Sequence, residues 1–152
     1  MFGGTLTYRT LTITAIGAVL LALTACSSYS GITAAHRTAE AKDDLPAGIR
    51  LAGPDMPSDF RLLTEDSGVK YFVAESSDYK TACIAVYPVD KPDQWIAGCS
   101  DGITGDREVV TVSHIGQATT KLVTTGFDTR GLESEGWRKI HDNILVGAVP
   151  RP

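Results

Sequence analysis

The chain has 152 residues, of which 43% are hydrophobic, and carries a formal net charge of −4. This length suits one compact domain and is too short for two, more so because the first 25 residues resemble a removed export signal, as described below. The basic residues do not cluster beyond Arg138-Lys139, whereas nucleic acids and anionic lipid headgroups are bound by clustered positive charge. The composition therefore argues against a nucleic-acid partner.

The first 25 residues have the order of an export signal. A polar leader with one positive side chain, Arg9, precedes an apolar run over 11–22, and small residues follow that run. A membrane-spanning helix needs about 20 apolar residues, so a permanent transmembrane anchor is the weaker interpretation. A signal peptide cut without lipidation is the nearer alternative, but it leaves an unexplained odd thiol at Cys26.

The run ends in Leu23-Thr24-Ala25-Cys26, which resembles the lipobox of bacterial lipoproteins. The resemblance implies that residues 1–25 are a removed signal peptide and that the Cys26 thiol carries a diacylglycerol held in a membrane. Two acyl chains, at about 0.8 kcal/mol per buried methylene, are sufficient for stable anchoring. The remaining 127 residues carry 13 basic and 18 acidic side chains, a formal charge of −5.

Residues 26–58 are predicted to form a lipid-anchored tether. The small polar residues after Cys26 indicate flexible chain. Residues 34–45 favour a helix, but almost all of their apolar residues are alanine, so we expect a short or frayed helix that ends at Pro46. Three prolines and two glycines between Pro46 and Ser58 predict a loop. The domain proper is expected over residues 59–150.

A hairpin is predicted at the start of this domain, because two β-rich runs flank Ser67-Gly68. With these two residues as the loop, Leu62 faces Val73 and Leu63 faces Phe72. The two runs cover residues 60–66 and 69–75.

Two further strands, over residues 81–88 and 95–100, contain the remaining cysteines, Cys83 and Cys99. A pair of cysteines in an exported chain is expected to form a disulfide. If the two lie directly opposite each other in an antiparallel ladder, Ala85 opposes Ala97, Tyr87 opposes Trp95, and all six side chains share one face. Closing a loop of this length contributes about 3 kcal/mol.

The density of β-branched residues predicts strands over 108–115 and 119–125. For the last segment we favour a loop followed by strands over 137–140 and 144–149, with a helix within 131–143 as the alternative. The predicted fold is therefore all-β and mainly antiparallel, with about seven short strands in a small barrel or sandwich.

The sequence contains no recognisable catalytic, cofactor or metal site. Cys83 and Cys99 lack the Cys-x-x-Cys spacing of thiol-disulfide enzymes, and three scattered histidines are a poor zinc set. Ser113 and His114 are neighbours in a predicted strand and would point to opposite faces. His36, in the tether, and His141, in a turn, are expected to be solvated, as are the acidic turns. Tyr79, beside a turn, is a better candidate for a surface contact than Tyr87 or Trp95, which are expected to lie in the core or over the disulfide.

The mature domain also resembles small lipoproteins exported by high-GC Gram-positive bacteria, a group with no established activity. The shared features are short runs, among them Gly68–Ala74, Ala82–Val86 and Gly98–Ser100. The anchor, the flexible tether and the lack of a recognisable catalytic site lead us to expect a non-enzymatic binding or interaction module, held at the membrane by Cys26, whose partner is an envelope protein or cell-wall component. The alternatives are an inhibitor of a cell-wall hydrolase and a small enzyme whose site is assembled from distant residues.

Overall fold

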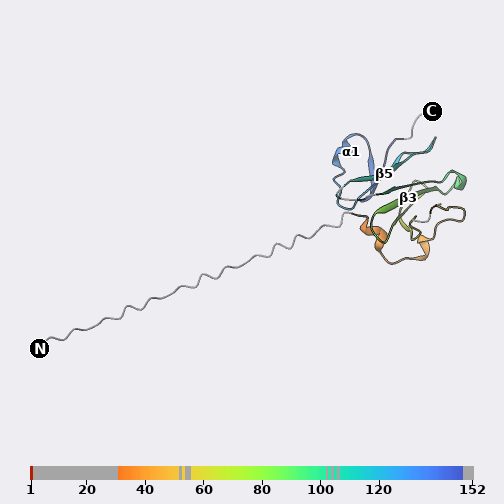
Figure 1. The fold of residues 1–152 in the computed structure, drawn as a ribbon. Helices are drawn as coiled ribbons and strands as arrows, with labels where there is room; N and C mark the ends of the chain where they lie inside the picture. Colours follow the sequence, from red (N-terminus) through yellow and green to blue (C-terminus); the bar gives the residue numbers. More distant parts are fainter. Residues whose placement is uncertain are drawn as a thin grey trace.

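The computed structural model describes residue 1 and residues 31–51, 53, 56–101, 103, 105 and 107–148 (Figure 1). The residues before Gly31 that carry the signal-peptide and lipidation predictions, Cys26 among them, lie outside the described residues. Within the described part, no helix combines the length and apolar character needed to cross a membrane.

The domain is mostly antiparallel β-sheet, as predicted. Its strands are β1 (Arg61–Asp66), β2 (Val69–Glu75), β3 (Thr81–Pro88), β4 (Ile96–Asp101), β5 (Glu108–Val112), β6 (Thr120–Val123), β7 (Arg138–His141) and β8 (Ile144–Val146). The helical segments are short: three 3-10 turns, η1 (Thr33–His36), η2 (Ala41–Asp43) and η3 (Pro92–Gln94), and one α-helix, α1 (Arg130–Ser134).

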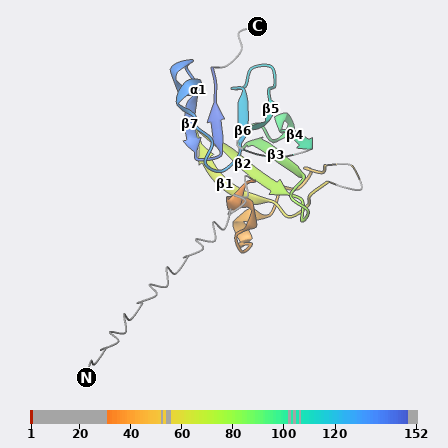
Figure 2. The same ribbon diagram turned by 60° about the vertical axis from the view of Figure 1, so that its left-hand side comes forward.

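The strands form two four-stranded sheets, in the orders β1-β2-β3-β4 and β5-β6-β8-β7. The sheets pack face to face, and their edges adjoin where β4 lies beside β5 and β1 lies beside β7 (Figure 2). Gly98 in β4 marks the closer edge, because a Cβ atom there would lie only 2.6 Å from Cγ1 of Val112. The architecture is therefore two packed sheets whose edges approach each other.

The first hairpin forms at Ser67-Gly68, but its register is only partly as predicted. Near the turn, Asp66 pairs with Val69 and Thr64 pairs with Tyr71, as the two-residue loop requires. A bulge between Leu62 and Thr64 then shifts the pairing by one residue, so that Leu62 faces Phe72 rather than Val73. The extra residue, Leu63, packs against the core between the sheets, so burial of its side chain accompanies the bulge.

The cysteine ladder is confirmed: Cys83 pairs with Cys99, Ala85 pairs with Ala97, and the two sulfur atoms form a disulfide. The predicted pairing of Tyr87 with Trp95 is absent, because the ladder ends at Val86 and Ile96 and Trp95 follows the 3-10 turn η3.

The last segment combines the two interpretations. A loop was predicted before the final strands, and a short helix, α1, occupies part of it. The strands themselves are present as β7 and β8, joined by a turn at Asp142-Asn143.

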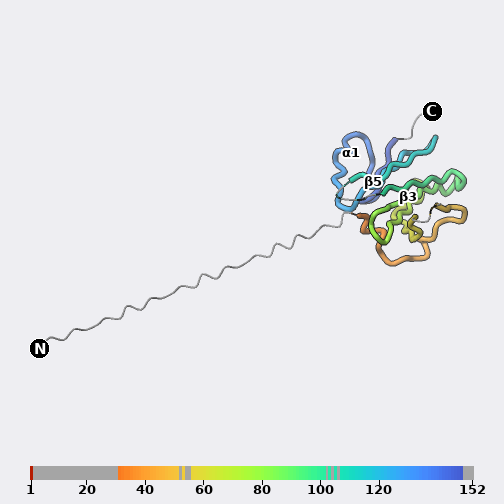
Figure 3. The backbone as a smooth tube through the Cα atoms, viewed as in Figure 1, coloured from red at the N-terminus to blue at the C-terminus, as the bar shows by residue number. Residues whose placement is uncertain are grey.

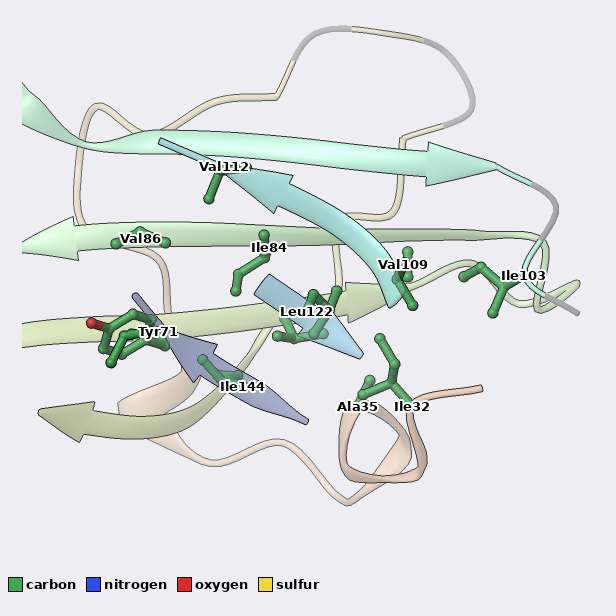
Figure 4. Packing of buried hydrophobic residues seen from close by; sticks show 13 residues of the cluster. Ile32, Ala35, Tyr71, Ile84, Val86, Ile103, Val109, Val112, Leu122 and Ile144 are labelled. Atoms are coloured by element: carbon green, nitrogen blue, oxygen red, sulfur yellow. The ribbon is translucent and has the colours of Figure 1, made fainter. Parts of the chain in front are cut away.

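The main core fills the space between the sheets (Figure 4). Ile84 from the first sheet and Leu122 and Ile144 from the second are all fully buried. Ile32 is also fully buried and belongs to this core, although it lies well before the first strand. The expected boundary at residue 58 thus divides residues that the structure packs together.

A second core covers the outer face of the first sheet. Phe72, Ala74, Cys83 and Ala85 point to this face, and Phe60 and the partly buried Leu45, Leu51 and Met56 pack on them. The chain before β1 therefore passes over the first sheet and forms a third layer (Figure 3). The sheet needs this layer because β2 and β3 carry apolar side chains on both faces.

Asp43 holds the covering segment in place. Its carboxylate accepts hydrogen bonds from the Arg37 guanidinium, from Glu40 N at 2.7 Å and from Leu62 N, in β1, at 2.9 Å. The Asp43 side chain is only 3% exposed. Hydrogen bonding from Arg37 holds the pKa of this carboxyl well below its usual range.

We expect Asp43→Asn to lower the free energy of unfolding by about 2–3 kcal/mol, because the amide would turn its own N–H donors toward these donors. The parent should also lose stability as the pH falls below about 3.8, the ordinary pKa of the Asp43 carboxyl. Because this pKa is lower in the folded protein, its contribution to stability is complete above the ordinary value and is lost progressively below it. Urea unfolding as a function of pH measures both effects.

The control is Asp128→Asn, because Asp128 forms a similar pair with Arg130 on the surface. An exposed pair contributes little, so this variant should unfold like the parent. Equal stability of the two variants would contradict the role given to Asp43.

Candidate functional site

Tyr79 lies in the turn between β2 and β3 and is exposed, with 47% of its surface accessible. Its φ of 60° places it in the left-handed region, where bulky residues are rare. The turn is held by backbone hydrogen bonds from Tyr79 N to Ser76 O and from Ser76 N to Thr81 O. Residues with strained backbone conformations cluster at functional sites, so this position of Tyr79 makes it a candidate for a functional contact.

The ring of Tyr79 packs on the imidazole of His36, with 4.9 Å between the ring centroids and a tilt of 57°. His36 ends η1, so the segment before β1 brings it to the β2–β3 turn. His36 is exposed, as predicted, but it is not a partnerless residue of a tether, because it contacts Tyr79 and Glu75. The tilted geometry is typical of favourable aromatic pairs.

Glu75, the last residue of β2, fixes both His36 and the start of the domain. Its side chain is fully buried, and Oε2 lies 2.7 Å from His36 Nε2 and accepts a hydrogen bond from Ile32 N at 3.1 Å. A buried carboxylate is expensive unless it is paired and hydrogen-bonded. The contact with Glu75 Oε2 therefore favours one position of the His36 ring, and through that ring one position of Tyr79.

A wide groove of about 650 Å³ opens beside this aromatic pair. Most of its lining is polar and comes from the segment before β1 and from the β2–β3 turn. The lining residues are His36, Met56, Pro57, Ser58, Asp59, Glu75, Ser76, Ser77, Asp78 and Thr81. The groove is open to solvent and its surface is mostly polar, which suits the hydrogen-bonding groups of an extended partner.

Two carboxylates on the groove are charged at neutral pH. A hydrogen bond from Arg61 lowers the pKa of Asp59, and a hydrogen bond from the Ser76 hydroxyl lowers the pKa of Asp78. Arg61 is itself buried and also donates from Nε to Arg37 O at 2.8 Å. The groove thus presents carboxylates beside an aromatic ring, and this combination can accept hydrogen bonds from donors on a partner.

Two hydroxyl groups of the groove, those of Ser76 and Thr81, form structural hydrogen bonds. Ser76 Oγ donates to Asp78 Oδ1 at 2.6 Å, and Thr81 Oγ1 donates to Asp101 Oδ1 at 2.8 Å. A hydroxyl nucleophile needs a base to take its proton, whereas these protons point to carboxylates that stabilise turns. Both hydroxyls therefore close the turn and the edge of the sheet.

The other two histidines lie apart from this groove. His114 is exposed just after β5, with Nδ1 3.0 Å from Ile115 O. His141 ends β7, where Nδ1 accepts a hydrogen bond from Asn143 N at 3.1 Å, and burial lowers its pKa. Among the residues the structure describes, no three His, Cys, Asp or Glu side chains are placed to hold a metal ion.

The sequence pointed to Tyr79 but not to its partners. His36 and Glu75 are 39 residues apart, and neither lies in a motif. The sequence signal that could have pointed to this pair is an acidic residue, Glu75, that directly follows the apolar run of a predicted strand. In the structure Glu75 ends β2 and is 7% exposed. No protein-family model, curated protein or solved structure matches this chain, so the site is interpreted from its own geometry.

We expect Tyr79→Asn to leave the free energy of unfolding unchanged or to raise it by up to about 1 kcal/mol. Asparagine tolerates the left-handed conformation, and this gain opposes the loss of the contact with His36. Thermal and urea unfolding measure the balance.

The matched control is Ser67→Asn, because Ser67 is the other non-glycine residue with positive φ, 52°, in the described part of the chain. This change loses no aromatic contact and only one exposed hydrogen bond, to Asp66, so it reports mainly the backbone gain. If Tyr79→Asn instead destabilises the domain by more than about 1 kcal/mol, the ring is a structural element and its strain needs no functional explanation.

Proposed function

We propose that this chain is a lipid-anchored, extracytoplasmic protein that acts as a non-enzymatic binding module, with the groove beside Tyr79 as its contact surface. The binding assignment rests on one observation: Tyr79 has a strained backbone conformation and an exposed ring, and this ring packs on His36. Glu75 in turn holds the His36 ring in position. Preorganised aromatic side chains bind partners at low entropic cost. The partner is an envelope protein or a cell-wall component.

Export and lipidation are proposed from residues 1–26. The disulfide supports export, because such bonds persist outside the reducing cytosol. The mature chain is negatively charged, so anionic lipids would not attract it. Membrane attachment is therefore assigned to the acyl chains on Cys26.

The position of the domain start supports a site that faces the membrane. Four residues separate Cys26 from Gly31, and the five Cα–Cα steps between the two can reach at most about 18 Å. Gly31 O accepts a hydrogen bond from Thr125 N, and the next residue, Ile32, donates its N–H to Glu75. The groove thus lies at the end of the domain nearest the proposed anchor, so its partner is one held close to the same bilayer.

The anchor is tested with Cys26→Ser in cells. We expect this variant to move from the membrane fraction to the soluble fraction and to lose the diacylglycerol mass from the mature protein. The folded domain should be unaffected, because its disulfide uses Cys83 and Cys99. A variant that stays membrane-bound with a normally processed N-terminus would contradict lipidation at Cys26.

The contact surface is tested by photo-crosslinking in intact cells. Position 79 receives the photoreactive residue p-benzoylphenylalanine, which keeps an aromatic ring at the turn. We expect a discrete crosslinked species that is absent when the probe replaces Ile115. Ile115 is the matched control because it is 85% exposed and lies in the separate β5–β6 connection. Equal crosslinking from both positions, or none from position 79, would contradict the proposed surface.

A further inference from the structure

Tyr71 is a buried polar group at the other end of β2 from the groove. It is 4% exposed and belongs to the core between the sheets. Figure 4 shows its ring near Ile144, with the hydroxyl oxygen pointing away from Ile84 and Leu122. Within the described part of the chain, no side chain or backbone group forms a hydrogen bond with this hydroxyl. Although the Tyr71 residue is buried, its hydroxyl oxygen keeps access to solvent, so water or a bound ligand can supply its hydrogen bond.

The hydroxyl end of Tyr71 lies between two adjoining hollows. One has a volume of about 210 Å³ and is bounded by β3, the segment around Lys91 and the β5–β6 connection at Gln117. The other, about 520 Å³, is bounded by the first hairpin turn, Arg138 and the chain after β8. Val69, Tyr71 and Ala118 line both hollows, so the two adjoin at the Tyr71 side chain.

The charges around these hollows are balanced. Asp66 and Arg138 form a two-point ion pair, with Oδ1 to Nη1 at 3.0 Å and Oδ2 to Nη2 at 2.7 Å. Asp90 and Lys91 contribute one further charge of each sign. Burial, with a smaller effect of Asp66, raises the pKa of Tyr71, so its hydroxyl remains a neutral donor and acceptor. The larger hollow has a mainly apolar lining that includes Ala118 and Val146, whereas Gln94 and Gln117 add polar groups to the smaller one.

We propose that these hollows form a binding site for a small uncharged molecule with an apolar, ring-sized body and one hydroxyl or carbonyl group that hydrogen-bonds to the Tyr71 hydroxyl. An apolar lining with a few placed polar groups is the usual composition of a small-molecule site, and the larger volume falls within the usual range of about 300–1,000 Å³. The balanced charges disfavour an ionic ligand, which would need an unpaired counter-charge.

This site is separate from the groove beside Tyr79 and does not depend on it. Val69 begins β2 and Glu75 ends it, and six residues of strand span about 20 Å. The hollows beside Tyr71 and the groove beside Tyr79 therefore lie at opposite ends of β2.

The test uses the mature chain, residues 26–152, with Cys26→Ser so that no lipid is attached. Cyclohexanol and cyclohexanone are titrated at millimolar concentrations, and the backbone amide signals of Val69, Ala118 and Gly147 are followed by NMR. We expect saturable shifts confined to the lining of the hollows. Cyclohexylammonium, which has the same ring but carries a charge, should bind at least several-fold more weakly.

Tyr71→Phe removes only the oxygen and should weaken cyclohexanol binding by about 3- to 10-fold, the range for one neutral hydrogen bond. Tyr79→Phe, the same change at the other end of β2, should bind like the parent. Ala118→Leu should abolish cyclohexanol binding, because the larger side chain fills space next to Tyr71. This second variant tests the site even if Tyr71→Phe fails to fold. Shifts that do not saturate, or Tyr71→Phe binding as tightly as the parent, would overturn the proposal.

Discussion

The fold depends on the burial of β2 and β3 on both of their faces. Two packed sheets cover only one face of each strand, so the outer face of the first sheet needs a further layer. The chain before β1 provides that layer, and Asp43 ties it to Leu62 in β1. Because the disulfide also lies in this outer core, the covering segment shields the cross-link from solvent.

The same requirement builds the candidate site. Ile32 enters the core between the sheets, η1 follows it, and His36 is thereby brought to Glu75 at the end of β2. The covering segment is thus both a structural layer and one wall of the groove beside Tyr79. Because η1 lies near the start of the described domain, the groove lies close to the point where the preceding chain enters the domain.

The two ends of β2 differ in what they offer a ligand. At the Glu75 end, carboxylates and an exposed ring border an open polar groove. At the Val69 end, balanced charges border two hollows that Tyr71 lines, and the larger hollow has a mainly apolar lining. The two proposed sites therefore differ in chemistry, one suited to an extended partner and the other to a small neutral molecule, and each can be tested without the other.

Local sequence patterns were sufficient for the strands, the Ser67-Gly68 turn and the Cys83–Cys99 pairing, because period-two burial and turn chemistry act over a few residues. Exposure of Tyr79 beside its turn was also foreseeable. The bulge at Leu63, the helix α1 and the second core were not, since each depends on which surfaces meet in three dimensions. Most of all, the His36–Glu75 pair joins a segment predicted to be a tether with the end of a strand. Only tertiary packing decides such a contact, because burial of Ile32 and the clamp at Asp43, not any local preference of residues 31–43, bring the two side chains together.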